Sequence, residues 1–212
     1  MSAPRRVSAR SARRRRQIVD AALSEVRAKA VADVSLSAIA ARAGLRPSHV
    51  LYYFESRDDV LIAAVEHAET QLAAGRAERL EAIDAGEARL AAFVGSYLPE
   101  DHHDPVWKLW IEGWLHSPSR AHFATVGRRA DEGWHAALVA CLEHAQARGS
   151  TLPDPAPAVA RRLLFLLDGL AVHVLAGHVD QAEAAEHAMA ALRAEVGGLA
   201  APAGAARTLE EA

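Results

Sequence analysis

Apolar residues recur every three or four positions along most of the chain, the spacing that gathers them on one face of an α-helix. The first such run, from Ile18 to Val26, predicts an amphipathic helix over 14–29. The β-branched residues Val31 and Val34 follow it and lower helix propensity, so we expect the helix to end before them.

Two short helices joined by a tight turn come next. The first is predicted over 36–43, because Ser35 is a favourable N-cap and Gly44 suits the left-handed position that often follows a helix end. The second begins at Pro47, whose missing N–H is not needed in the first helical turn, and its apolar positions continue to Phe54. This arrangement is typical of a helix-turn-helix whose second helix enters the DNA major groove, although an ordinary corner of two helices has the same pattern.

The rest of the chain also predicts helices in series, separated by glycine and proline. They cover 58–82, 87–98, 106–116, 119–148, 156–177 and 181–196. The sequence therefore predicts an all-α fold, in which an N-terminal three-helix helix-turn-helix domain is joined to a C-terminal helical domain. The predicted segments are a basic, flexible arm over 1–13, the helix-turn-helix domain over 14–60, the helical domain over 61–198 and a flexible tail over 199–212.

Composition supports helices and limits the other classes. Ala, the best helix former, accounts for 49 of the 212 residues. The single Cys141 excludes an intramolecular disulfide framework and fits a reducing compartment. The longest apolar stretch, 163–177, contains Asp168 and His173 and is shorter than the roughly 18 residues of a membrane-spanning helix. The N-terminus lacks the apolar core of a secretory signal, so we expect a soluble, cytoplasmic protein with no membrane partner.

The net charge of −3 conceals an asymmetry. Residues 1–60 contain 12 Lys and Arg against 6 Asp and Glu, whereas residues 61–212 contain 12 against 21. A basic N-terminal part on an acidic body predicts a module that binds a polyanion. The alternative is a basic tail that binds nothing specific.

The stretch 15–65 resembles the N-terminal DNA-binding domain of TetR-family transcriptional repressors. The matching segments are RRQIVDAALSEV, SLSAIAARAGL, RPSHVLYYF and ESRDDVL, in the order and spacing of the family. The resemblance implies a double-stranded DNA operator as a partner. It places base-reading residues on the second short helix and phosphate contacts around it.

Residue by residue, the resemblance assigns base reading to Pro47, Ser48 and His49, and phosphate contacts to Ser35, Ser37 and Arg57. We add Arg46, Leu51, Tyr52 and Tyr53 as further DNA-contacting residues. The family usually has Tyr where this chain has Leu51, which cannot hydrogen-bond a phosphate. Either a neighbouring Tyr replaces that contact or Leu51 packs on a thymine methyl group. The N-terminal arginines are expected either to enter the minor groove or to act as a non-specific electrostatic tail.

The segments WKLWIEGWLHSP and LLFLLDGLAVHVL resemble the C-terminal region of the BetI-type subgroup of this family. That resemblance implies a region that binds a small-molecule effector and forms a homodimer. An apolar seam in the last helix and a preceding helix that is apolar on nearly all sides fit a four-helix interface between two subunits. The predicted interface residues are Leu163, Leu167, Leu170, Val174, Ala185, Met189, Leu192 and Val196.

Candidate effector-binding residues are Trp107, Trp110, Trp114, Asp168 and His173. The three tryptophans share one helical face, which forms either part of the core or the wall of a pocket for a cationic or planar ligand. Asp168 lies in an apolar helix and must be paired or functional. It would bind a ligand cation, cap a helix or pair with an arginine such as Arg128 or Arg129.

No metal site, cofactor or enzyme motif is predicted. The histidine spacings, including His102-His103 and the pair His173 and His178, do not match a structural zinc site, and one cysteine supplies no thiolate pair. The sequence has no phosphate-binding glycine loop, nucleophile elbow or paired-carboxylate motif. We therefore expect a ligand-responsive, homodimeric repressor rather than an enzyme. The alternatives are a DNA-binding regulator controlled by a protein partner, or a helical enzyme or carrier with a basic tether.

Overall fold

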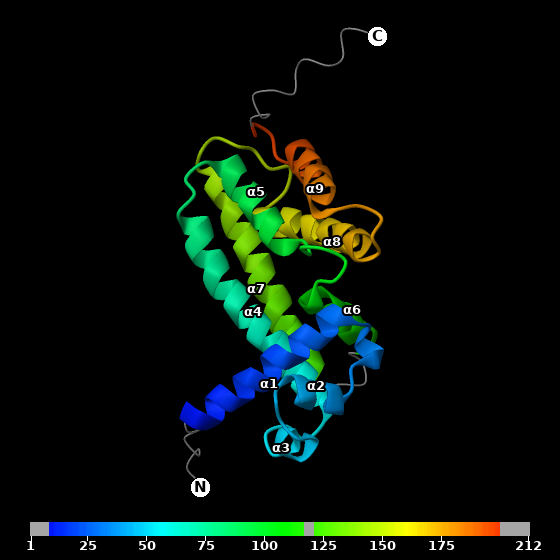
Figure 1. The fold of residues 1–212 in the computed structure, drawn as a ribbon. Coiled ribbons are helices and arrows are strands. Elements are labelled where there is room, and N and C mark those ends of the chain that lie inside the picture. The colour runs from blue at the N-terminus through cyan, green and yellow to red at the C-terminus, as the bar shows by residue number, and fades with distance from the viewer. Residues whose placement is uncertain (1–8, 117–120, 200–212) are drawn as a thin grey trace. The chain divides into compact units, whose positions relative to one another are not determined.

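The computed structural model describes residues 9–116 and 121–199. The described residues form helices, and their β pairing is limited to an isolated bridge between Thr151 and Gly197 (Figure 1). The all-α fold predicted from the sequence is confirmed. The elements are α1 (Ala9–Ala28), the short 3-10 helix η1 (Val31–Asp33), α2 (Leu36–Arg42), α3 (Pro47–Leu51), α4 (Arg57–Glu81), α5 (Gly86–Tyr97), α6 (Pro105–His116), α7 (Ala121–Gln146), α8 (Ala156–Leu175) and α9 (Gln181–Glu195).

Two predicted boundaries differ from the structure. Helix α1 begins at Ala9, so residues 9–13 of the predicted flexible arm are helical. Arg and Ala are strong helix formers, and they extend the helix beyond its apolar face. Helix α3 ends at Leu51 rather than near Phe54. The first eight residues of the predicted arm and residues 200–212 of the predicted tail lie outside the described residues.

The chain forms two compact units that follow packing rather than chain order. The N-terminal unit combines residues up to Gln71 with His103–Ala130, and the C-terminal unit combines Leu72–His102 with the residues from Asp131 onwards. Helices α4 and α7 therefore each contribute to both units. The predicted division at residue 60 did not include α6 and the first part of α7 in the N-terminal unit.

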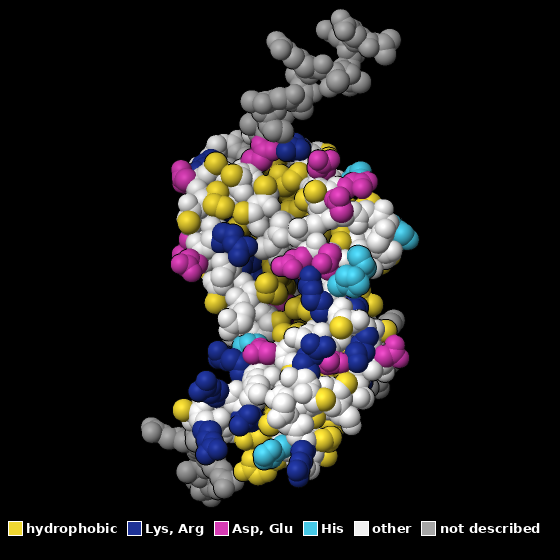
Figure 2. Space-filling model, in the orientation of Figure 1, with side chains coloured by type: hydrophobic (Ala, Val, Ile, Leu, Met, Phe, Trp, Pro, Cys, Tyr) yellow, Lys and Arg dark blue, Asp and Glu magenta, His cyan; other side chains and the backbone are white. Residues whose placement is uncertain are grey.

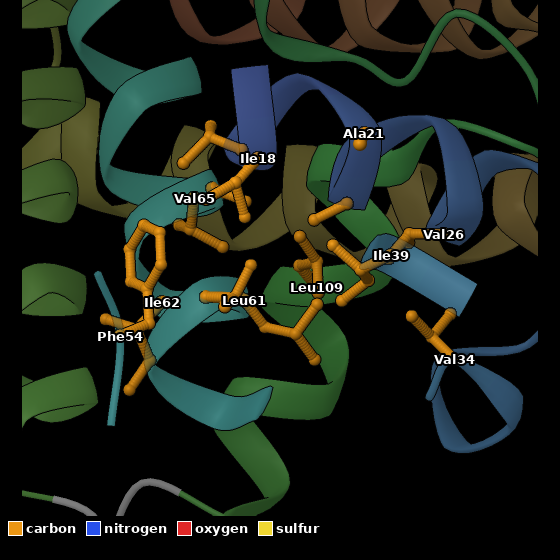
Figure 3. Packing of buried hydrophobic residues seen from close by; sticks show 14 of the residues in the cluster. Ile18, Ala21, Val26, Val34, Ile39, Phe54, Leu61, Ile62, Val65 and Leu109 are labelled. Carbon is orange, nitrogen blue, oxygen red and sulfur yellow. The ribbon is translucent and has the colours of Figure 1, made fainter. Parts of the chain in front are cut away.

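A continuous apolar core holds the N-terminal unit together. Figure 3 shows Ile18 of α1, Ile39 of α2, Val65 of α4 and Leu109 of α6 among its members. All four side chains are at most 3% exposed. Because α6 supplies part of this core, the first three helices of the chain do not bury their apolar faces by themselves.

Gly113 of α6 has no room for a larger residue, because a Cβ atom there would overlap the ring of Phe123 in α7. We expect Gly113→Ala to lower the free energy of unfolding by about 1–3 kcal/mol, the usual cost of overpacking a core. Gly95→Ala in α5 is the matched control, since its Cβ would meet nothing within 4 Å. That control should raise stability by up to about 1 kcal/mol through helix propensity alone. Equal melting temperatures for the two variants would contradict this account.

The C-terminal unit is built around α5, α7, α8 and α9. Phe93, Leu142, Leu164 and Leu192 bring one large buried side chain from each of these helices. Helix α9 packs on both α5 and α8. At the periphery, Arg193 of α9 donates to the Glu87 carboxylate of α5 at 2.7 Å.

Candidate nucleic-acid interface and effector site

Helix α3 is anchored on one side and exposed on the other. Val50 is fully buried and Phe54, just beyond the helix, is 4% exposed. The Arg15 guanidinium lies 4.1 Å from the centre of the Phe54 ring and donates to the Tyr53 carbonyl, which fixes the end of the helix against α1. The predicted base-reading residues Pro47, Ser48 and His49, together with Arg46, Leu51 and Tyr52, are exposed, whereas Tyr53 is half-buried.

The turn that presents α3 has the predicted chemistry. The Ser35 hydroxyl accepts a hydrogen bond from the Ala38 amide at 3.1 Å, which makes it the N-cap of α2. Gly44 has a φ of 65°, and the Leu45 amide donates to the Ala40 carbonyl at 2.8 Å. This is the left-handed helix end that glycine adopts without strain. Ser37 is exposed on the first turn of α2.

Arg57 is engaged within the chain, whereas the sequence assigned it to phosphate. Its Nε donates to the Val34 carbonyl at 2.5 Å, another guanidinium nitrogen donates to the Val31 carbonyl, and Nη1 contacts the Asp58 carboxylate at 3.0 Å. The guanidinium thus closes the η1 segment onto α4. Any phosphate contact by Arg57 would have to coexist with these bonds.

The surface around α1 and α3 is basic. Arg10, Arg13 and Arg16 of α1 are exposed, and Figure 2 shows Lys and Arg side chains gathered in this part of the molecule. By contrast, Glu25 is buried and forms ion pairs with Lys29 and Arg42. These two cations lower the pKa of the Glu25 carboxyl. Exposed cations beside exposed polar side chains can contact phosphates and base edges together.

The tryptophan face of α6 is divided between core and surface. Trp110 is buried against Phe123, and its Nε1 donates to the Glu69 carboxylate of α4 at 2.7 Å. Trp107 is buried too, whereas Trp114 is 44% exposed and meets the Trp107 ring edge to face. Trp110 is therefore a structural residue that ties α6 to α4, and the pair of Trp107 and Trp114 is the part of this face nearest to solvent.

A lysine that the sequence analysis did not select connects α6 to α1. Lys108 Nζ donates to the carbonyls of Val26 at 2.7 Å and Lys29 at 2.9 Å, at the end of α1. The last carbonyls of a helix have no partner within the helix, so a cation there satisfies them and complements the helix dipole. Periodicity gave no sign of this contact, since the residues lie about eighty positions apart.

Asp168 is the polar centre of an aromatic cluster in the C-terminal unit. The Tyr97 hydroxyl donates to its carboxylate at 2.5 Å, so its partner is neither Arg128 nor Arg129. The Tyr97 ring lies 4.9 Å from that of Trp134, and the Arg76 guanidinium covers Trp134 at 3.7 Å. The sequence analysis missed Tyr97, Trp134 and Arg76. The signal available was Asp168 itself, a carboxylate inside an apolar helix that required a partner.

Burial raises the pKa of the Asp168 carboxyl, and the hydrogen bond from Tyr97 offsets part of this shift. The folded chain therefore holds the proton more tightly than the unfolded chain does. The stabilising contribution of Asp168 is complete below its ordinary pKa and is lost as the pH rises through its raised pKa. At neutral pH, the buried carboxylate carries a desolvation cost.

Two substitutions of Asp168 should therefore have different effects at pH 7. Asp168→Asn keeps an oxygen that accepts from Tyr97 and removes the charge, so we expect a melting temperature equal to or above that of the wild type. Asp168→Ala removes the acceptor and should cost about 1–3 kcal/mol. Thermal unfolding at pH 7 and pH 4 tests this prediction, and the advantage of Asn over Asp should shrink at the lower pH. Equal destabilisation by both variants at pH 7 would contradict it.

The remaining predicted effector residue, His173, is exposed on α8 and contacts His178 rather than the aromatic cluster. No group of three or more His, Cys, Asp or Glu side chains in the described parts of the chain is arranged to hold a metal ion. Burial raises the pKa of the Cys141 thiol to about 11, so this cysteine is a poor nucleophile.

The predicted dimer seam is a correction. Six of its eight residues are already buried within the chain, because α8 and α9 pack on each other and α9 packs on α5. These six are Leu163, Leu167, Val174, Met189, Leu192 and Val196. Leu170 and Ala185 are half-buried. The apolar residues that α8 leaves exposed are instead Phe165, Leu166 and Val172, at 65%, 39% and 46% exposure.

A narrow apolar groove runs beside this exposed face. It encloses about 220 Å³, part of it open to solvent. Residues of α5, α7, α8 and α9 line it, among them Phe93, Leu138, Leu166 and Leu192. In the described ranges, no helix is both long enough and apolar enough to span a bilayer.

Comparison with known families gives two matches. The family described as "BetI-type transcriptional repressor, C-terminal" matches residues 86–197, and "Bacterial regulatory proteins, tetR family" matches residues 18–64. The HTH-type transcriptional regulator BetI of Burkholderia mallei (strain NCTC 10229) is 32% identical over 163 residues, 74% of this chain and 79% of that protein. The protein of the same name from Cronobacter sakazakii is 29% identical over 160 residues, 74% of this chain and 77% of that protein.

Solved structures share the fold. A putative transcriptional regulator from Saccharomonospora viridis in complex with choline aligns with a TM-score of 0.80 and 22% identity, over 87% of this chain and 98% of that one. The transcriptional regulator FadR from Bacillus subtilis in complex with stearoyl-CoA aligns with a TM-score of 0.67 and 17% identity, over 84% of this chain and 96% of that one.

Proposed function

Because the chain belongs to the TetR family of transcriptional regulators and has a BetI-type C-terminal region, we propose that it is a homodimeric repressor controlled by a small-molecule effector. Two copies bind a palindromic operator, and the effector releases them from it. The observation that carries the proposal is helix α3, whose apolar side is anchored while its polar side is exposed within a basic surface.

Operator binding uses Ser48 and His49 on base edges, with Ser35 and Ser37 near the backbone phosphates. Tyr52, which is 79% exposed beside Leu51, supplies the hydroxyl that Leu51 lacks. A large exposed aromatic side chain next to a recognition helix is otherwise unfavourable in water. The half-sites face each other across a two-fold axis, which requires a dimer.

The dimer forms through the exposed face of α8. Phe165, Leu166 and Val172 are apolar and exposed in the single chain, and covering them would remove apolar surface from water. This face replaces the predicted seam, whose side chains are occupied within the chain.

The effector is a cation of the quaternary ammonium class, bound at the Tyr97, Trp134 and Asp168 cluster. Aromatic rings attract such cations through their faces, and a carboxylate supplies the opposite charge. The complex of the Saccharomonospora viridis regulator with choline supports this class of ligand. Trp107 and Trp114 of α6 are the alternative position for the same chemistry.

Release requires that the effector favour the form of the dimer that does not bind DNA. The contacts that would transmit the change lie in the N-terminal unit, where Lys108 connects α6 to α1 and Trp110 connects α6 to Glu69 of α4. A shift of α6 alters both contacts and thereby changes the support of the helix-turn-helix.

The test is fluorescence anisotropy of the full chain on DNA flanking its own gene, with scrambled DNA as competitor, at about 50 and about 200 mM salt. We expect binding at a palindromic site that scrambled DNA does not displace, and release by choline or a related quaternary amine. Equal binding to both DNAs would overturn the repressor function. Specific binding that no small molecule weakens would overturn effector control and favour a protein-controlled regulator.

A further inference from the structure

The C-terminal end of α8 brings two histidines together through its backbone. Gly177 has a φ of 70°, its amide donates to the Val174 carbonyl at 3.0 Å, and the His178 amide donates to the His173 carbonyl at 3.0 Å. These paired bonds form a Schellman motif, in which the residue after the glycine packs on the residue five positions before it. In most helices that pair is apolar. Here both members are imidazoles.

The two rings face each other through equivalent nitrogens. His173 Nδ1 and His178 Nδ1 are 3.1 Å apart, and the ring centres are 5.4 Å apart. A neutral pair can place one proton between these atoms, so one nitrogen donates and the other accepts. A metal ion can replace that proton and bind both nitrogens as acceptors.

The separation suits such an ion. Metal–nitrogen bonds of about 2.0–2.1 Å to two atoms 3.1 Å apart subtend roughly 100° at the metal. This angle lies between the values for square-planar and tetrahedral coordination, which late transition metals adopt with imidazole ligands. Both side chains are exposed, so an ion has direct access and water can complete its coordination.

We propose that His173 and His178 form a chelating site for a divalent late transition metal ion, with Cu²⁺ bound more tightly than Ni²⁺ or Zn²⁺. The site has two protein ligands and leaves the other positions open, in keeping with the absence of larger ligand clusters in the described residues. It lies on the line of α8 that contains Leu166 and Gly169, at the end of the exposed apolar face. It is independent of the DNA and effector functions proposed above.

The test is isothermal titration of the untagged, full-length protein with Cu²⁺ and with Ni²⁺ in a non-coordinating buffer at neutral pH. We expect one tight equivalent per chain, weakened at least about tenfold by His173→Gln and by His178→Gln alike, because each removes half of the chelate. His187→Gln, an exposed histidine on α9, is the matched control and should bind normally. All substituted side chains are exposed, so the fold should tolerate the changes.

The histidine pair in the loop after α5 provides the decisive comparison. His102→Gln with His103→Gln should leave the tight equivalent intact. Loss of binding in that variant, or unchanged binding in both α8 variants, would overturn the proposal. Loss in only one α8 variant would also overturn it, because a single histidine would then hold the ion without chelation.

Discussion

Replacing Ser48 and His49 together by alanine is expected to remove operator preference while the protein stays folded. Each good base contact contributes about 1–3 kcal/mol of discrimination, so two lost contacts reduce specific affinity by roughly 30-fold to more than 10,000-fold. Both side chains are exposed, whereas the adjacent Val50 anchors α3 in the core. Anisotropy on the operator and on scrambled DNA measures the effect, and the melting temperature controls for folding.

Affinity for scrambled DNA should change little in this variant, because phosphate contacts dominate non-specific binding. An equal loss on both DNAs would mean that Ser48 and His49 contact the backbone rather than bases. Leu51→Tyr gives an opposite change at the neighbouring position. Since Leu51 is 49% exposed, α3 has room for the phenol, and its hydroxyl should tighten binding to both DNAs by the value of one phosphate contact.

The second large effect is expected in the salt dependence of DNA binding. Arg10, Arg13 and Arg16 lie exposed on the first turns of α1, where the sequence analysis expected a flexible arm. Replacing all three by glutamine should flatten the slope of log affinity against log salt by about 2.7 if each contacts one phosphate. Between 50 and 200 mM salt, this is a roughly 40-fold smaller loss of affinity than in the wild type.

The control removes the same charge elsewhere. Arg79, Arg128 and Arg129 are also exposed, and their triple glutamine variant should keep the wild-type slope. Glutamine preserves side-chain length and helix propensity, so both variants should remain folded. If the two variants flattened the slope equally, the effect would come from net charge at long range and not from contacts by α1.

The local structure of the DNA-binding region could be predicted because its determinants are close in sequence. Ser35 caps α2, Gly44 turns the chain and Pro47 starts α3, and each acts within four residues of its own position. Propensity and capping report such short-range effects directly. Even there, Arg57 was assigned to phosphate, because nothing in its sequence neighbourhood showed that the carbonyls of Val31 and Val34 would surround it.

The partners of long-range contacts could not be predicted in the same way. The spacing of Met189, Leu192 and Val196 correctly marked an apolar face, but spacing does not tell whether the same chain or a second copy covers it. Asp168 required a partner, and Tyr97 lies 71 positions away on another helix. Such pairings depend on how helices pack, which one-dimensional periodicity does not contain.

The contribution of α6 and α7 to the N-terminal core also has a consequence for synthesis on the ribosome. Leu109, Trp110, Phe123 and Val126 belong to the core that contains Ile18 and Val65. At about 5–20 residues per second, the ribosome needs roughly 3–12 s to proceed from Val65 to Val126. Throughout this interval, the helix-turn-helix segment is outside the finished fold, with apolar surface that chaperones can bind. A nascent chain stalled before residue 109 should therefore be digested readily by protease, and one extended well past residue 126 should resist.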